Sequence, residues 1–267
     1  MPLHDNTTAS AGGWVGASGT ATFSHDSGSN SNRFLAIYIV WGFTSDHHIT
    51  GVTYNSVSMT QFAAAFNQAG ICTMQGFYLI NPSSGSNTVA ISWIQDGAGN
   101  SYFSATAQTF SAVHQTTPYS NYAQAAVSDA SSPFVASITI TSEAGDLVVA
   151  SAMAVHTAAS GTWTAGAGQT ERADIQGSTY LFTTQTASEE AGAASVVMDH
   201  TCTTSLNYAG NLGYSLNPAA GSTATAINIG DAWKDIAGMQ INIGDAWKVV
   251  PSAQINIGDT WKAVDFA

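Results

Sequence analysis

Residues 33–61 read RFLAIYIVWGFTSDHHITGVTYNSVSMTQ, and this stretch decides the fold class. After Arg33, residues 34–41 are apolar at both odd and even positions, so we expect a strand from Arg33 to Trp41 in the middle of a sheet, buried on both faces. The last thirteen residues predict a hairpin that turns at Asn55-Ser56, because Asn tolerates the left-handed conformation of tight turns. This turn would place Tyr54 opposite Val57. The stretch therefore predicts antiparallel β-structure.

Outward from this stretch, short runs rich in Val, Ile, Thr, Phe and Tyr alternate with clusters of Gly, Ser, Asn and Pro. Such alternation is typical of an antiparallel β domain. The expected strands are Thr20 to Ser24, Arg33 to Trp41, Ile49 to Tyr54, Val57 to Gln61, Gly70 to Ile80, Asn87 to Ile94, Tyr102 to Phe110, Phe134 to Thr141, Asp146 to Val155, Thr179 to Thr184, Ala194 to Asp199 and Asn207 to Leu216. Twelve strands predict a two-sheet sandwich over residues 1–217.

Composition limits the partners of the chain. Apolar residues make up 45% of the 267 residues and charged residues only 8%, and the formal charge of −12 would repel nucleic acid and anionic lipid. The longest apolar run, Phe34 to Phe43, is about half the ~20 residues of a membrane-spanning helix. The N-terminal stretch MPLHDNTTASAGG has neither a basic nor an apolar region, so no secretory signal is expected. We expect synthesis in the cytoplasm without membrane insertion.

Two cysteines are too few for a disulfide framework. Buried free thiols are the expected state of Cys72 and Cys202 in a chain that folds in reducing cytosol. A bridge between them is the alternative, if neighbouring strands bring them together.

The hairpin and the buried strand before it resemble a β-sandwich module of many phage and bacterial surface proteins, in which the hairpin usually reads VTYNG. Here Ser56 replaces the final Gly. The resemblance continues through GFYLINPSSGSNTVAISW (76–93), FSATAQTFSAVHQTTPY (103–119) and EAGDLVVASA (143–152), and covers roughly the first 60% of the chain. It implies a jelly-roll-like sandwich with a structural or a sugar-binding role.

After a small-residue linker at residues 218–224, residues 225–267 repeat a fourteen-residue unit three times. INIGDAWK begins at Ile227 and again at Ile241, and INIGDTWK begins at Ile255. Each copy has two extended pieces around a Gly-Asp turn, which predicts one hairpin per repeat. The residues that we expect at an assembly interface are Ile227, Ile229, Trp233, Lys234, Ile241, Ile243, Trp247, Lys248, Ile255, Ile257, Trp261 and Lys262.

Loop length decides which of these side chains share a face. With a two-residue Gly230-Asp231 loop, Trp233 would lie beside Asn228. With a three-residue loop or a bulge, Ile229 would oppose Trp233, and the isoleucines and the tryptophan would form one apolar face. We prefer the second arrangement.

The repeats resemble the short WK-containing repeats near the C-termini of phage structural proteins, often written VNVGGxWKxV, with Asp in place of the second Gly. About 43 residues of thin hairpins lie below the size at which a single core suffices, and no Cys or His follows Asn217 to supply a disulfide or a metal site. We therefore expect the apolar residues of the hairpins to be buried by another copy of the chain, for example in a trimer, or by other virion proteins. All three lysines lie in the repeats, where they either pair with acidic groups or keep an apolar edge from aggregating.

Two motifs carry metal-binding residue types. In Asp46-His47-His48 only a loop could bring both imidazoles to one ion, and a solvated polar loop is the preferred interpretation. Residues 26–32, DSGSNSN, offer oxygens but one carboxylate, so we interpret them as a turn rather than a calcium site. No metal and no cofactor are expected.

Glycan cleavage needs two carboxyl groups roughly 5–9.5 Å apart. The candidates in the second half are Glu171, Asp174, Glu189 and Glu190, although the adjacent pair would diverge on a strand. Trp14, Trp41, Trp163 and Tyr180 either stack on sugars or fill the core. The sequence is interpreted as a non-enzymatic, peripheral phage virion protein, such as a head decoration, head fibre or tail-associated protein. The alternatives are a carbohydrate-binding adhesin for a host glycan and a glycan depolymerase.

Overall fold

The chain forms antiparallel β-structure in a computed structural model, and it divides into two compact units, Met1–Ala219 and Ala220–Ala267. The described residues exclude 16–17, 43–46, 64–65, 69–71, 96–100, 128–132, 156–160, 176–182, 204–207, 220–224, 229–232, 237–238, 244–245, 251, 258–259 and 266–267. In several strands, including all those after residue 224, only the backbone is described. The all-β prediction is confirmed. Within the described residues, no helix is long and apolar enough to cross a membrane.

The first half of unit 1 holds two sheets. Its strands are β1 (Leu3–Val15), β2 (Gly19–Asp26), β3 (Phe34–Gly42), β4 (His47–Tyr54), β5 (Val57–Ser58), β6 (Thr60–Gln61), β7 (Phe66–Gln68), β8 (Cys72–Ile80), β9 (Ser86–Gln95) and β10 (Ser101–Ser111). Inner sheet 1 has the order β1-β10-β3-β8-β6, with β7 also pairing with β8. Outer sheet 1 has the order β2-β9-β4-β5.

The second half repeats this arrangement. Its strands are β11 (Tyr119–Val127), β12 (Phe134–Ile140), β13 (Leu147–Val155), β14 (Trp163–Ala165), β15 (Thr170–Ile175), β16 (Thr183–Ala191), β17 (Val196–Cys202) and β18 (Tyr208–Leu216). Inner sheet 2 has the order β11-β18-β13-β16-β15, and outer sheet 2 has the order β12-β17-β14. Each strand takes the position of its counterpart in the first half.

The pairing registers of the two halves also agree. The central strand β3 pairs over nine residues with β10 and over nine with β8. Its counterpart β13 pairs over nine residues with β18 and over nine with β16. In each half, an inner sheet with five strands on its path faces an outer sheet that begins β2-β9-β4 or β12-β17-β14, and this order is that of a jelly roll. The sandwich predicted for residues 1–217 is therefore two jelly rolls in tandem.

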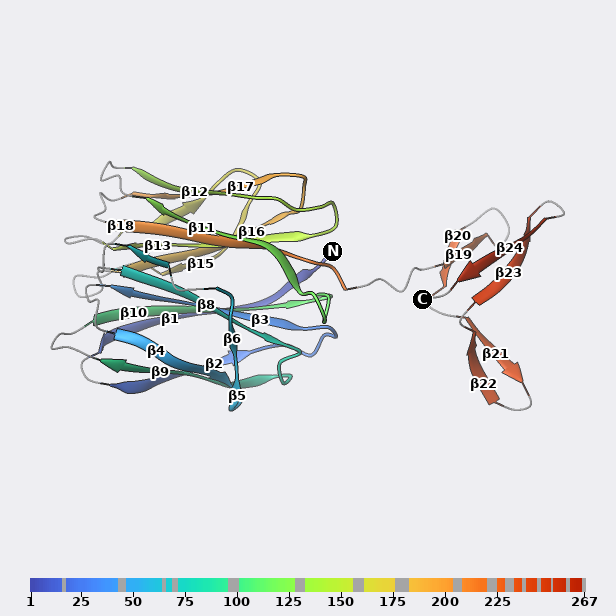
Figure 1. Cartoon of the computed structure of the whole chain (residues 1–267), viewed down its shortest axis with the longest axis horizontal. Helices are drawn as coiled ribbons and strands as arrows, with labels where there is room; N and C mark the ends of the chain where they lie inside the picture. The colour runs from blue at the N-terminus through green and yellow to red at the C-terminus, as the bar shows by residue number, and fades with distance from the viewer. Residues whose placement is uncertain are drawn as a thin grey trace. The chain divides into compact units, whose positions relative to one another are not determined.

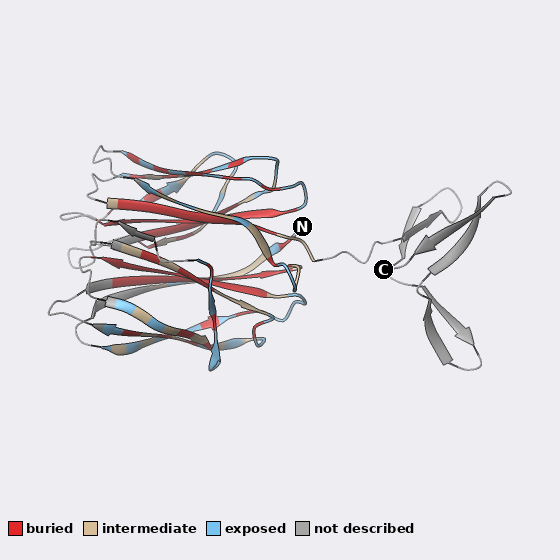
Figure 2. Cartoon of the chain, in the orientation of Figure 1, coloured by how far each residue is buried: buried red, intermediate tan, exposed pale blue. Residues whose placement is uncertain are grey.

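The two rolls make a stack of four layers, with the inner sheets face to face in the middle (Figure 1). One apolar cluster fills the first roll, two fill the second, and a fourth lies between the inner sheets. Every residue of β3 and of β13 is buried (Figure 2). The expectation that the apolar run has cover on both faces is thus confirmed, and the second roll supplies one of the covers.

Phe62, on the chain between β6 and β7, is central to the junction between the rolls. Its ring stacks on Tyr214 of the second roll at 4.6 Å between centroids, and it lies 4.9 Å from both Tyr78 and Tyr119. Burial raises the pKa of the Tyr214 hydroxyl, which hydrogen-bonds the Tyr38 hydroxyl across the junction. Aromatic packing therefore joins the inner sheets on the β8 and β18 side.

Polar side chains occupy the other side of the junction, where β10 faces β16. Gln185 donates to the Tyr38 carbonyl at 3.3 Å and accepts from the Ser104 hydroxyl at 3.3 Å. Glu189 forms an ion pair with Arg172, which occupies a β-bulge of β15. The bulge turns the arginine toward the carboxylate, as bulges often re-aim side chains.

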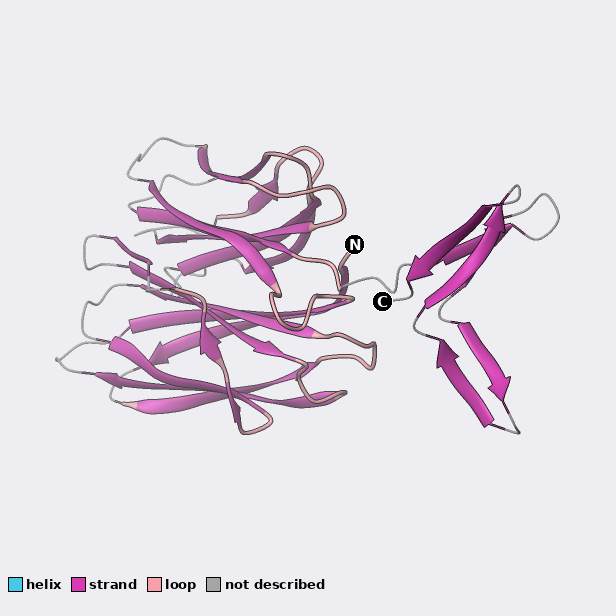
Figure 3. Ribbon diagram, turned by 45° about the vertical axis from the view of Figure 1, so that its right-hand side comes forward, coloured by secondary structure: helices cyan, strands magenta, loops and turns pink. Residues whose placement is uncertain are grey.

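Unit 2 consists of three two-stranded hairpins in the described residues (Figure 3). They are β19 (Thr225–Asn228) with β20 (Trp233–Ile236), β21 (Met239–Ile243) with β22 (Ala246–Val250), and β23 (Ser252–Ile257) with β24 (Thr260–Asp265). Within the described backbone, no strand of one hairpin pairs with a strand of another.

Several strands differ from the sequence expectation. β1, β11, β14 and β15 lie in segments for which no strand is predicted, and β16 lies mostly beyond the expected Thr179 to Thr184. These segments are rich in Ala, Ser, Thr, Asn and Gln, so they lack the apolar alternation that marks a strand. Their ladders with distant strands decide their conformation.

Candidate functional site

The hairpin of β4 and β5 forms one wall of a pocket at the edge of the first roll. Asn55 and Ser56 both have positive φ, 49° and 64°, and Tyr54 pairs with Val57, so the predicted turn and its register are confirmed. The Tyr54 hydroxyl donates to the Gly85 carbonyl at 2.8 Å. The hairpin is therefore anchored to the adjacent β8–β9 connection and does not project freely.

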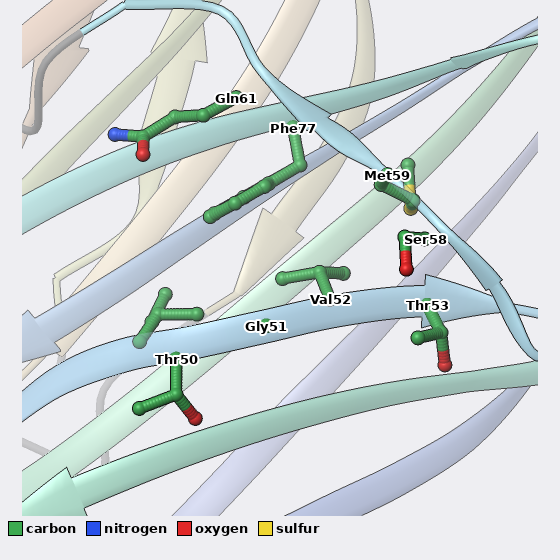
Figure 4. Close-up of a pocket in the computed structure, with 9 residues that line it drawn as sticks. Thr50, Gly51, Val52, Thr53, Ser58, Met59, Gln61 and Phe77 are labelled. Atoms are coloured by element: carbon green, nitrogen blue, oxygen red, sulfur yellow. The ribbon is translucent and has the colours of Figure 1, made fainter.

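The pocket has a volume of about 290 Å³ and opens between β4 and the strands β6 and β8 (Figure 4). Its residues are Ile49, Thr50, Gly51, Val52, Thr53, Ser58, Met59, Gln61 and Phe77. Val52 and Phe77 lie on facing sides of the opening, and the segment that carries Ser58 and Met59 crosses between the two sheets. Val52, Met59 and Phe77 are buried and form an apolar floor.

The rim of the pocket is polar and uncharged. It consists of the side chains of Thr50, Thr53, Ser58 and Gln61. None of these four has a hydrogen-bond partner among the described residues. A bulge between Ile49 and Gly51 interrupts the regular ladder of β4 beside the opening. The pocket therefore offers unused hydroxyl and amide groups above an apolar floor, a combination suited to a small uncharged ligand.

The predicted assembly residues lie in unit 2, and their side chains are outside the described residues, as is the whole of Ile229. The backbone register is described, and it differs from the preferred three-residue loop. Asn228 pairs with Trp233, and Ile227 with Lys234. The other two hairpins have the same register, with Asn242 opposite Trp247 as one example.

This register corresponds to the two-residue Gly-Asp loop, so the preferred interpretation was wrong. By register, Ile227, Lys234 and Ile236 share one face of the first hairpin, and Asn228 and Trp233 share the other. Each face thus combines apolar and polar residues.

The four candidate carboxylates do not form one described site. Glu189 is buried and pairs with Arg172, while its neighbour Glu190 is only partly buried. Glu171 accepts a hydrogen bond from the Ala165 amide at 3.3 Å, and burial followed by the nearby Asp174 charge raises its pKa. The adjacent glutamates diverge, as a strand requires.

Among the described residues, the other candidates for sugar stacking or metal binding have structural roles. Trp41 and Trp163 fill cores, whereas the side chain of Trp14 and the whole of Tyr180 lie outside the described residues. The Asp26 carboxylate accepts from the Gly28 amide at 2.8 Å, which stabilises the DSGSNSN turn. Asp46 lies outside the described residues, among which no group of three metal-binding side chains is found.

The Cys202 side chain is buried in outer sheet 2 and does not form a disulfide. The side chain of Cys72 lies outside the described residues, and its backbone belongs to inner sheet 1. Inner sheet 2 lies between these two layers (Figure 1). The placement of the strands therefore supports the expectation of separate thiols.

No protein-family model and no curated protein matches the sequence. Solved structures of infectious bursal disease virus show similarity over most of the chain. The VP2 subviral particle matches at 12% identity with a TM-score of 0.31, over 81% of this chain and 42% of that chain. The Gx strain structure matches at 12% identity with a TM-score of 0.29, over 82% and 42%. The chain thus spans about two fifths of the viral chains.

Sequence reasoning identified the hairpin but not the pocket beside it. The detectable signal is the polar pattern Thr50, Thr53, Ser58 and Gln61 around a confirmed turn. Phe77 belongs to a distant strand, and only tertiary pairing places it across from Val52.

Proposed function

We propose that the chain is a non-enzymatic structural protein of a phage virion, placed peripherally as a head decoration, head fibre or tail-associated protein. The tandem rolls form its body, and the C-terminal hairpins attach it to further copies or to other virion proteins. The observation that carries this proposal is that each hairpin, in its described backbone, pairs only within itself. Isolated two-stranded hairpins are marginally stable in water, so these three must pack against another protein surface to be stable.

Charge favours a partner that includes the body of a second copy. Residues 1–224 carry a net charge of about −10, from Arg33 and Arg172 against twelve acidic residues. The three lysines all belong to the hairpin repeats. Attraction between lysines of one copy and carboxylates of another would orient association, with a trimer as the proposed arrangement.

Deletion of residues 225–267 tests the proposal. We expect the shortened chain to keep its β-sheet circular dichroism, to be monomeric by light scattering, and to be absent from purified particles. The full chain should associate and be incorporated. Full incorporation of the shortened chain would reject the proposal.

Point variants separate the contributions within the repeats. The triple change Trp233→Ala, Trp247→Ala and Trp261→Ala should abolish association, because it removes the large apolar side chains that need cover. The matched triple change Lys234→Gln, Lys248→Gln and Lys262→Gln should weaken association and reduce its salt dependence if the lysines pair with acids. If they instead protect an edge, this variant should aggregate while its specific association persists.

A further inference from the structure

The pocket-forming hairpin is an addition to the first roll. In the second roll β14, the counterpart of β4, ends at Ala165, and β15 begins at Thr170 after four intervening residues. In the first roll β4 continues to Tyr54 and returns as β5 before β6 begins. The second roll closes with the same strand order without this hairpin, so the jelly roll itself does not require it.

The added hairpin is held rigidly. Its turn places two consecutive non-glycine residues at positive φ, and the Met59 amide donates to the Val52 carbonyl at 2.9 Å where the chain leaves β5. Tyr54 is completely buried. One wall of the pocket is therefore fixed before any ligand arrives, which lowers the entropy lost on binding.

We infer that this pocket binds a neutral, hydroxyl-bearing ligand of the size of one sugar residue. Its volume, about 290 Å³, lies at the lower end of the roughly 300–1,000 Å³ of small-molecule sites. Hydroxyl and amide side chains both donate and accept hydrogen bonds, as sugar hydroxyls do. The floor of Val52, Met59 and Phe77 suits the apolar C–H face of a sugar ring.

The chemistry of the pocket disfavours two other ligand classes. No described residue of its lining is charged, so a phosphate, a carboxylate or an ammonium group would lose its hydration without gaining a partner. An added peptide strand needs a regular strand edge, and the bulge at Ile49 to Gly51 disrupts that edge. The inference goes beyond the proposed virion role and does not depend on it.

The test is a nuclear magnetic resonance titration of the full chain with glucose, galactose, mannose, rhamnose and N-acetylglucosamine, followed by neutral oligosaccharides. We expect at least one sugar to shift the amide signals of Gly51, Ser58 and Gln61. Binding of the monosaccharide itself indicates a site for free sugar, and binding of oligosaccharides alone indicates a site for one unit of a glycan. Glucuronic acid, which is charged, should not bind.

The double variant Ser58→Ala/Gln61→Ala should weaken this binding at least tenfold. Its matched control is Ser137→Ala/Thr139→Ala, which changes two exposed residues on the outer face of β12 and should bind as the unchanged chain does. Thermal melting verifies that both variants fold. Absence of shifts at the three amides with every sugar, or equal binding by the pocket variant, overturns the inference. Deletion of residues 225–267 should leave sugar binding unchanged, so this result is independent of the assembly test.

Discussion

Ser56 occupies a backbone conformation that glycine adopts without strain. Its φ is 64°, in the left-handed region, where a side chain costs roughly 1–2 kcal/mol. Ser56→Gly should therefore raise the free energy of unfolding by about 1 kcal/mol, less the added chain entropy of glycine. Urea denaturation checks this, with Gly85→Ala (φ 76°) as the opposite change, which should destabilise the protein. A lower free energy of unfolding for Ser56→Gly would show that the Ser56 backbone is not strained.

Two buried histidines make stability depend on pH. Burial lowers the pKa of His25 and of His200 to about 4, despite the opposing charges of Asp26 and Asp199. The His25 ring bonds the hydroxyls of Thr8 and Thr109, and the His200 ring bonds that of Ser188, so neutral imidazoles are satisfied in the fold.

Between pH 6.5 and pH 4 the unfolded chain binds protons that the folded chain does not. Stability is therefore complete above pH 6.5 and falls with decreasing pH, by about 2 kcal/mol per histidine at pH 5. Urea midpoints at pH 7.5 and pH 5 measure the loss. His200→Gln should remove about half of it, whereas the same change at the exposed His48 should leave it unaltered. An equal loss in the His200 variant would argue against the buried imidazole as the cause.

At the scale of elements, β8 and the β6–β7 connection pack closely because Gly76 of β8 has no side chain where the Phe62 ring lies. A Cβ on Gly76 would lie 2.9 Å from Cδ2 of Phe62, whose ring is enclosed by Tyr214, Tyr119 and Tyr78. Because the ring has little room to move, Gly76→Ala should cost on the order of 1–3 kcal/mol.

A chemical denaturation series checks this prediction. Gly51→Ala is the matched control, since a Cβ there meets nothing within 4 Å, and it should change stability by less than about 0.5 kcal/mol. The additional change Phe62→Leu should reduce the cost of alanine at position 76, which identifies the ring as the obstacle. Equal effects of alanine at both glycines would exclude that contact.

At the scale of the whole molecule, the two rolls share a core. The cluster between the inner sheets includes Phe34, Tyr38 and Met74 from the first roll and Val149, Met153 and Tyr214 from the second. Separation of the rolls would expose this apolar surface to water. We expect residues 1–224 to unfold in one cooperative transition, with equal calorimetric and van't Hoff enthalpies. Two resolved transitions in scanning calorimetry would show instead that the rolls are energetically independent.

Local sequence determined the features that depend on near neighbours. The apolar run in β3, the Asn55-Ser56 turn and the fourteen-residue repeat are visible without a fold, because backbone preference and hydrophobic pattern act within a few residues. The unpatterned strands are different. In β16, TTQTASEEA, buried Gln185 hydrogen-bonds Ser104 across the junction, and buried Glu189 pairs with Arg172 of the neighbouring strand β15. These buried residues are polar, so the sequence of β16 does not show that the strand is buried.

Only the tertiary structure decided that residues 1–219 form two rolls and that a pocket lies beside the hairpin. The ladder of β1 with β10 joins Leu3 to Ser111, and the pocket joins Val52 to Phe77, so both depend on pairing between distant segments. The residues of a strand indicate that its faces must be buried, but they do not specify which sheet buries them. Burial is non-directional, and hydrogen-bonded register with distant strands selects the partner.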